Sequence, residues 1–165
     1  MKRIVLVLLA ITPIFVFSQK KVKNEINWMT LKEAKVLAKK YNENILVYFY
    51  KQNCPYCDKM KNETLNDPTV IDIINRNFFA VKIDSRTKDT IYYNNTSYTN
   101  QQPIDHGYTW RHDFYAEVAS IKRDNTTRVT TPSIVLFDKE FEKITLLPGN
   151  QPKELLIRRL KKHIN

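Results

Sequence analysis

Residues 45–57 of the chain read ILVYFYKQNCPYC. The first six of these residues form a continuous run of aliphatic and aromatic side chains, which is typical of a strand buried on both faces. Cys54 and Cys57 follow after a short polar link, and Pro55 between them suits the first turn of a helix, where its missing N–H costs nothing. The sequence therefore predicts that the Cys-x-x-Cys motif lies where a buried strand passes into a helix.

Predicted helices and strands alternate on both sides of this junction. Thr30 and Glu33 predict a capping box at the start of a helix that runs to about residue 41, and Asp67 followed by Pro68 predicts the start of another helix. Runs of apolar residues predict further strands, and a helical spacing of apolar residues predicts a last helix. The predicted strands cover residues 45–50, 78–83, 133–137 and 143–147, and the last helix carries Leu156, Ile157, Leu160 and Ile164 on its inner side.

The segment between the second and third predicted strands has a different composition. Residues 85–117 are polar and aromatic with few aliphatic side chains, which predicts an inserted loop or hairpin. A short helix is predicted over residues 112–121, followed by a turn over residues 123–127.

Length, composition and charge exclude several classes of protein and of binding site for this chain. The chain has 165 residues, of which 42% are hydrophobic, which is enough for one compact domain. It has two glycines, which excludes collagen, a glycine-rich phosphate loop and a dinucleotide-binding fingerprint. The formal net charge is +10, but Lys and Arg are spread along the chain and mixed with acidic residues. We interpret this excess as solvated surface and predict no nucleic-acid partner.

The N-terminal residues have the pattern of a secretory signal. Lys2 and Arg3 precede an apolar run over residues 4–17, which is shorter than the roughly 18 residues that a spanning helix needs. Ser18 is small, as signal peptidase requires at the cleavage position. We predict a signal peptide over residues 1–18, a single domain over residues 19–165, and export to the periplasm or secretion. The alternative is an uncleaved N-terminal anchor.

The spacing of the two cysteines argues against a disulfide that serves only to stabilise the fold. A bridge between Cys54 and Cys57 closes so small a loop that it constrains the unfolded chain little. The motif therefore indicates redox exchange or half of a metal site. His106 and His112 are the candidates to complete a zinc site, but their spacing is loose. We predict no metal and no cofactor.

The order of these landmarks resembles the thioredoxin superfamily, and in particular its exported bacterial members. The resemblance rests on Asn53-Cys54-Pro55-Tyr56-Cys57 after an apolar strand, Thr131-Pro132-Ser133 before another strand, Gly149 ahead of the last helix, and Trp28 ahead of the first helix and strand. It covers about residues 26–84 and 118–163. It implies an α/β fold with a central mixed sheet flanked by helices, and with the 85–117 segment inserted before the strand that follows Pro132.

The chemistry of the motif assigns a different role to each cysteine. Thiol–disulfide exchange needs a thiolate, and the N-terminus of a helix stabilises one. We therefore expect Cys54 to be the accessible nucleophile and Cys57, one turn further into the helix, to be the shielded thiol that resolves the mixed disulfide. The resemblance further implies that the Thr131–Pro132 peptide is cis and that its backbone pairs with the substrate chain.

Several positions depart from the family pattern. Cytosolic thioredoxins have Trp at the position of Asn53 and Gly-Pro at the positions of Pro55 and Tyr56. Pro-Tyr is the dipeptide of glutaredoxins, but the residues that hold glutathione are not recognisable in this chain. Thioredoxins place a buried acid, the proton acceptor for the second cysteine, at the position of Tyr48. The proton acceptor for Cys57 is therefore not identified from the sequence.

Together these features predict an exported thiol–disulfide oxidoreductase that reduces or isomerises disulfides in exported proteins, with electrons from a membrane partner. The helix N-terminus is the one recognisable stabiliser of the Cys54 thiolate, which favours a potential near that of glutaredoxins, about −200 to −230 mV, over the −120 mV or so of strong oxidants. A cation such as His106 or Arg111 beside the thiolate would favour the alternative of a disulfide-donating oxidase. A second alternative is a non-enzymatic module that binds a metal or a partner protein. Tyr108, Trp110 and Tyr115 either contact substrate or pack the 85–117 segment onto the domain.

Overall fold

The computed structural model describes residues 25–101, 103 and 111–164, and its centre is a five-stranded sheet. The strands are β1 (Trp28–Met29), β2 (Asn44–Tyr50), β3 (Phe78–Asp84), β8 (Ser133–Phe137) and β9 (Lys143–Pro148), in the spatial order β1-β3-β2-β8-β9. β1, β3 and β2 are parallel, whereas β8 is antiparallel to both β2 and β9. The sheet is therefore mixed, as predicted.

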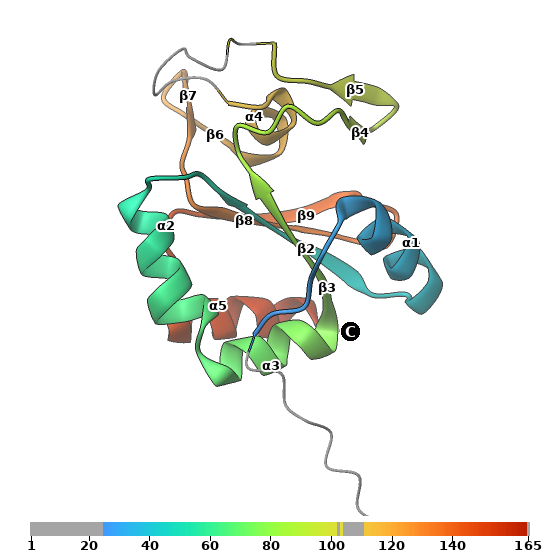
Figure 1. Cartoon of the computed structure of the whole chain (residues 1–165), viewed down its shortest axis with the longest axis vertical. Coiled ribbons are helices and arrows are strands. Elements are labelled where there is room, and N and C mark those ends of the chain that lie inside the picture. Colours follow the sequence, from blue (N-terminus) through green and yellow to red (C-terminus); the bar gives the residue numbers. More distant parts are fainter. Residues whose placement is uncertain (1–24, 102, 104–110, 165) are drawn as a thin grey trace, which may run out of the picture.

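Helices flank this sheet (Figure 1). The helices α2 (Pro55–Met60), α3 (Pro68–Asn77) and α5 (Lys153–Leu160) lie together, and α1 (Leu31–Tyr41) and α4 (Asp113–Ala119) pack with the opposite face. The chain ends with a short 3₁₀ helix, Lys161–His163. This arrangement confirms the predicted α/β fold.

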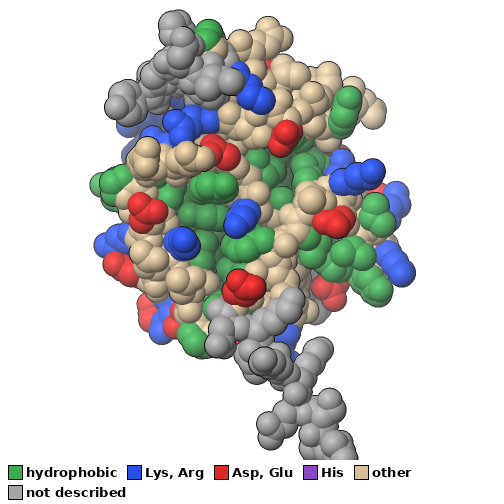
Figure 2. All heavy atoms as spheres, in the orientation of Figure 1, with side chains coloured by type: hydrophobic (Ala, Val, Ile, Leu, Met, Phe, Trp, Pro, Cys, Tyr) green, Lys and Arg blue, Asp and Glu red, His purple; other side chains and the backbone are tan. Residues whose placement is uncertain are grey.

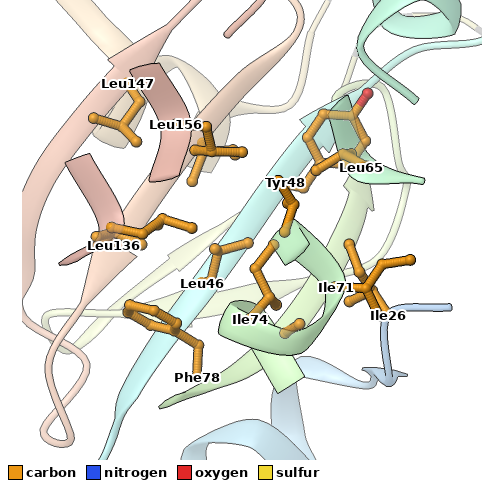
Figure 3. Packing of buried hydrophobic residues seen from close by; sticks show 14 of the residues in the cluster. Ile26, Leu46, Tyr48, Leu65, Ile71, Ile74, Phe78, Leu136, Leu147 and Leu156 are labelled. Atoms are coloured by element: carbon orange, nitrogen blue, oxygen red, sulfur yellow. The ribbon is translucent and has the colours of Figure 1, made fainter. Parts of the chain in front are cut away.

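The central position of β2 explains its continuous apolar sequence. Leu46 and Tyr48 belong to the hydrophobic cluster beneath α2, α3 and α5, of which Figure 3 gives a close view. The alternate residues Ile45, Val47 and Phe49 belong to the cluster beneath α1 and α4. Both faces of the strand are covered, so the side chains on each face are shielded from solvent. This favours hydrophobic residues at consecutive positions.

The predicted helix starts are confirmed at the level of single hydrogen bonds. The Glu33 N–H donates to Thr30 Oγ1 at 3.2 Å, and the Thr30 N–H donates to Glu33 Oε2 at 3.0 Å, which completes the capping box of α1. At α3, Asp67 Oδ1 accepts the N–H groups of Thr69 and Val70. Local sequence thus specifies where these helices begin.

A π-helix, Lys61–Leu65, continues α2 and was not predicted. It turns the buried side chains of Thr64 and Leu65 inward. Thr64 Oγ1 donates to the Gln151 carbonyl at 2.8 Å, just before α5 begins. The π-helix therefore ties the end of the cysteine-bearing helix to the last helix of the chain.

The segment between β3 and β8 contains two hairpins and α4. The hairpins are β4 (Ile91–Tyr93) with β5 (Thr96–Tyr98), and β6 (Ser120–Arg123) with β7 (Thr126–Val129). The predicted helix over residues 112–121 is wrong at its C-terminal end, because the backbone of Ser120 is extended and its hydroxyl donates to the Ala116 carbonyl that a continuing helix would use. His106, Tyr108 and Trp110, like the predicted signal peptide, lie outside the described residues. Among the residues that are described, no helix is long and apolar enough to cross a membrane.

Candidate active site

Cys54 is the N-cap residue of α2, with extended backbone angles of φ −121° and ψ 103°. The Cys57 N–H donates to Cys54 Sγ at 3.3 Å. Asn53 directly before it adopts a left-handed φ of 53°, a conformation that Asn tolerates better than most residues. The sulfur of Cys54 thus lies at the positive end of a helix, where it shares the Cys57 N–H with the Cys54 carbonyl, which accepts the same N–H at 2.9 Å.

The pairing of β2 with β8 brings Thr131 and Pro132 beside this sulfur. Phe49 pairs with Ser133, so the ends of the two strands lie next to each other although the two cysteines and Thr131 are far apart in sequence. The Thr131–Pro132 peptide is cis, which confirms the prediction. Cys54 Sγ donates to the Thr131 carbonyl at an S···O distance of 3.9 Å.

The two thiols are almost equally buried. Both cysteines are free, with 3% of Cys54 and 5% of Cys57 exposed. The expectation that Cys54 is accessible is therefore wrong, because its sulfur is directed at the Thr131 carbonyl rather than at solvent. The intervening residues face outward instead, and Tyr56 is 67% exposed.

A family model described as a thioredoxin-like domain matches residues 31–164. The chain belongs to this thioredoxin-like family. The matched residues contain both cysteines, the cis-proline and every strand of the central sheet except β1.

Comparison with solved structures agrees with this membership at the level of the fold. A structure described as DsbH oxidoreductase is 17% identical, with a TM-score of 0.58 and 84% of each chain covered. A thioredoxin from Thermus thermophilus is 21% identical, with a TM-score of 0.55 and coverage of 84% of this chain and 86% of that one. A disulphide isomerase from Xylella fastidiosa is 16% identical, with a TM-score of 0.50 and coverage of 79% and 86%. No curated protein matches the sequence.

The surroundings of Cys57 favour its neutral thiol. Burial is the largest cause that raises the pKa of Cys57, to about 12, while a backbone hydrogen bond from Lys51 and the charge of Lys51 act in the opposite direction. Tyr48, at the position of the acid in other thioredoxin-like proteins, donates its hydroxyl to the Cys57 carbonyl at 3.5 Å. Burial also raises the pKa of Tyr48, so its hydroxyl stays protonated and does not serve as the base for Cys57.

A cavity of about 380 Å³ reaches Cys57 from the side of Tyr48. Lys51, Lys61, Lys82, Asp58 and Glu25 also line it. A larger groove of about 1100 Å³ shares Trp28, Tyr50 and Lys82 with this cavity and extends toward α1. Figure 2, in the orientation of Figure 1, shows hydrophobic side chains near the centre of the view, with charged side chains of both signs among and around them. Cys57 is therefore the thiol next to a cavity that charged side chains line.

The geometry of His112 does not support the alternative of a zinc site. This residue is the N-cap of α4 and is 1% exposed. Its Nδ1 accepts the Phe114 N–H at 3.1 Å, and its Nε2 lies 2.8 Å from the Asp89 carbonyl, to which it donates. Among the described residues, no group of three or more His, Cys, Asp or Glu side chains is placed to hold a metal ion.

Tyr115 of α4 joins the site in a way that the sequence did not reveal. Its ring packs on Phe49 with centroids 4.6 Å apart, and the residue is 1% exposed, so it packs in the core rather than contacting substrate. Its hydroxyl nevertheless reaches the loop before β8, where it donates to the Thr130 carbonyl at 2.7 Å. Burial raises the pKa of this tyrosine, while its hydrogen bond with Thr131 and, to a smaller extent, the charge of the exposed Arg111 act in the opposite direction.

Proposed function

We propose that this thioredoxin-like protein is a thiol–disulfide oxidoreductase whose redox centre is the Cys54–Cys57 pair. The observation that carries the proposal is the position of Cys54 Sγ, which caps α2, accepts the Cys57 N–H and lies beside the cis Thr131–Pro132 peptide. A sulfur at a helix N-terminus is stabilised as a thiolate, which is the form that attacks disulfides.

The proposed reaction has two exchange steps. The Cys54 thiolate attacks one sulfur of a substrate disulfide, that S–S bond breaks, and the departing substrate thiolate takes a proton from water. Cys57 then loses its proton to water, and its thiolate attacks Cys54 Sγ, which forms the Cys54–Cys57 disulfide and breaks the mixed disulfide; the second substrate sulfur leaves as a thiolate and takes up a proton from water. Two electrons pass from the protein dithiol to the substrate, and a thiol-containing electron donor must reduce the Cys54–Cys57 disulfide again.

Thr131 and Pro132 form the proposed substrate side of the site. Substrate entry requires that the Thr131 carbonyl exchange its contact with Cys54 Sγ for a contact with the substrate backbone. Because both cysteines are buried, a substrate disulfide must displace this loop contact to reach the sulfur. Pro55 and Tyr56, which lie between the two cysteines in sequence, are exposed.

We propose further that the protein acts outside the cytoplasm. The charged start, apolar run and small residue of residues 1–18 support a cleavable signal peptide and export to the periplasm. Reduction or isomerisation of disulfides in exported proteins then needs a membrane partner that supplies electrons. The fold likeness to structures described as an oxidoreductase and a disulphide isomerase is consistent with this role.

Trapping of the mixed disulfide tests the proposed activity. Cys57→Ser, incubated with a peptide that contains one disulfide, should accumulate a covalent complex linked through Cys54, because the resolving thiol is absent. Cys54→Ser is the matched control and should form no such complex. Failure of Cys57→Ser to form the complex would contradict the proposed nucleophile.

Equilibration with glutathione redox buffers tests the direction of electron flow. The capped Cys54 sulfur supports a potential of about −200 to −230 mV, as in glutaredoxins. A value near −120 mV would instead make the protein a disulfide donor.

A further inference from the structure

We infer that Tyr115 is a positioning residue for the proposed redox site: from α4, its hydroxyl fixes the loop that carries the Thr131 carbonyl against Cys54. This inference rests on the proposed function, because it takes the Cys54–Cys57 pair as the redox site. Tyr115 itself lies outside the Cys-x-x-Cys motif and outside the Thr131–Pro132 pair.

The hydrogen bonds around Tyr115 define its orientation. The Tyr115 hydroxyl lies 2.7 Å from the Thr130 carbonyl, to which it donates, and 3.0 Å from Thr131 Oγ1. A phenol has one hydrogen to donate, so in the second contact the Thr131 hydroxyl is the donor. The Ser133 hydroxyl also donates to the Thr130 carbonyl. Tyr115 is thus held by both Thr130 and Thr131, immediately before the cis-proline.

Burial makes this contact rigid. Thr130 is exposed and Thr131 is half-buried, whereas Tyr115 is 1% exposed and packs on Phe49 of the central strand. The tyrosine therefore connects an exposed loop to the buried central strand β2. A buried hydroxyl that loses its hydrogen-bond partners is left desolvated and unpaired, which is unfavourable, so the contact resists opening.

The start of α4 is fixed in turn by His112. The His112 N–H donates to the Ser85 carbonyl at 2.7 Å, and its ring bonds to the Asp89 carbonyl and the Phe114 N–H. The helix that carries Tyr115 is therefore anchored to the chain just after β3. The position of the Thr131 carbonyl then depends on a segment that supplies no reacting group.

The Tyr115 hydroxyl should affect how substrate binds rather than how Cys54 Sγ reacts. A polypeptide substrate pairs with the backbone before Pro132, so it is sensitive to the position of the Thr131 carbonyl. A small aromatic disulfide such as 5,5′-dithiobis(2-nitrobenzoate) needs only the Cys54 sulfur. Loss of the Tyr115 hydroxyl should therefore weaken the reaction with a polypeptide substrate and leave the reaction with the small disulfide unchanged.

The test compares Tyr115→Phe with Tyr98→Phe in the reduction of insulin and of the small disulfide. Tyr98 is a suitable control because it packs on Phe114 in the same aromatic cluster. For Tyr115→Phe we expect KM for insulin to rise by about three- to tenfold, as for the loss of one hydrogen bond, with kcat and the rate on the small disulfide within about twofold of wild type. Tyr98→Phe should change neither substrate. An equal loss on both substrates, or no loss on either, would overturn the inference.

A second measurement is independent of activity. Amide hydrogen exchange at Thr131 and Ser133 should become faster in Tyr115→Phe by about three- to tenfold, and faster again when Ser133→Ala is added, while exchange in β2 stays unchanged. Unchanged exchange at Thr131 and Ser133 would overturn the positioning role even if the enzyme is active. Faster exchange in a protein that reduces no disulfide would instead refute the proposed function and leave the positioning role in place.

Discussion

Cys54 and Cys57 differ little in burial but greatly in their surroundings. Cys54 Sγ accepts an N–H at the start of α2 and faces a carbonyl of the β8 loop. Cys57 lies within the helix, beneath the protonated Tyr48 and beside a cavity, and burial raises its pKa to about 12. Exposure therefore does not distinguish the proposed nucleophile, Cys54, from the proposed resolving thiol, Cys57. Their positions in α2 and their hydrogen-bond partners do.

Replacement of Cys54 or Cys57 by serine should change the rate of disulfide reduction more than any other substitution considered. Cys54→Ser should lower the rate of disulfide reduction by at least about 1,000-fold, since the remaining thiol, Cys57, is buried and its raised pKa keeps it protonated at neutral pH. Cys57→Ser should still attack substrate in a single turnover and then stop as the mixed disulfide. A stopped-flow assay under single-turnover conditions separates the two. Equal single-turnover rates for the two variants would remove the assigned difference between the cysteines.

The resolving step should depend strongly on pH. In the mixed disulfide Cys54 no longer carries a thiol, so its contribution to the raised pKa of Cys57 is lost, but burial, the largest cause, remains. The thiolate fraction of Cys57, and with it the rate of substrate release, should therefore rise with pH by up to about tenfold per unit. Rapid-quench analysis of the pre-formed mixed disulfide measures this rate. Lys51→Gln should slow release at every pH, because the charge of Lys51 lowers the pKa of Cys57. A pH-independent rate would mean that a nearby group accepts the proton.

The same pKa predicts how stability changes in base. Above about pH 9 the Cys57 thiol ionises in the unfolded chain but stays protonated in the folded one, so the folded state binds more protons. The free energy of unfolding should then fall with rising pH between about 9 and 12, by at most about 1.4 kcal/mol per unit. Urea unfolding of wild type and Cys57→Ala at pH 8 and pH 10 checks the sign. An equal fall in both proteins would exclude Cys57 as its source.

The smallest effect is expected at Tyr48. Because its hydroxyl stays protonated and its bond to the Cys57 carbonyl is long, at 3.5 Å, Tyr48→Phe should change the rate of resolution by less than about threefold. The ring stays in the core, where it packs on Trp28 with centroids 6.0 Å apart. A larger fall in the rate of substrate release at pH 7 would give the hydroxyl a role in proton transfer.

Local signals in the sequence predicted much of this molecule. The capping box at Thr30, the Asp67–Pro68 start of α3 and the buried run of β2 each depend on neighbouring residues, and each is confirmed. The cis peptide before Pro132 came from the family resemblance rather than from local signals.

What the sequence did not predict depends on contacts between distant residues. Cys54 Sγ contacts the Thr131 carbonyl, 77 positions away in sequence. The hydrogen bond from Tyr115 to the Thr130 carbonyl depends on the way α4 packs on β2. The π-helix after α2 is tied down by Gln151, 87 positions from Thr64. No periodicity or short motif encodes such pairs, so they emerge only when the sheet is assembled.

Competitive alkylation of the fully reduced protein measures the reactivity of the two cysteines against each other. Because the two residues are 3% and 5% exposed, a difference in their rates reports chemistry rather than access. With limiting iodoacetamide at pH 7, followed by peptide mass spectrometry, we predict that Cys54 is modified at least about tenfold faster than Cys57. Equal labelling, or faster labelling of Cys57, would contradict the assignment of Cys54 as the nucleophile.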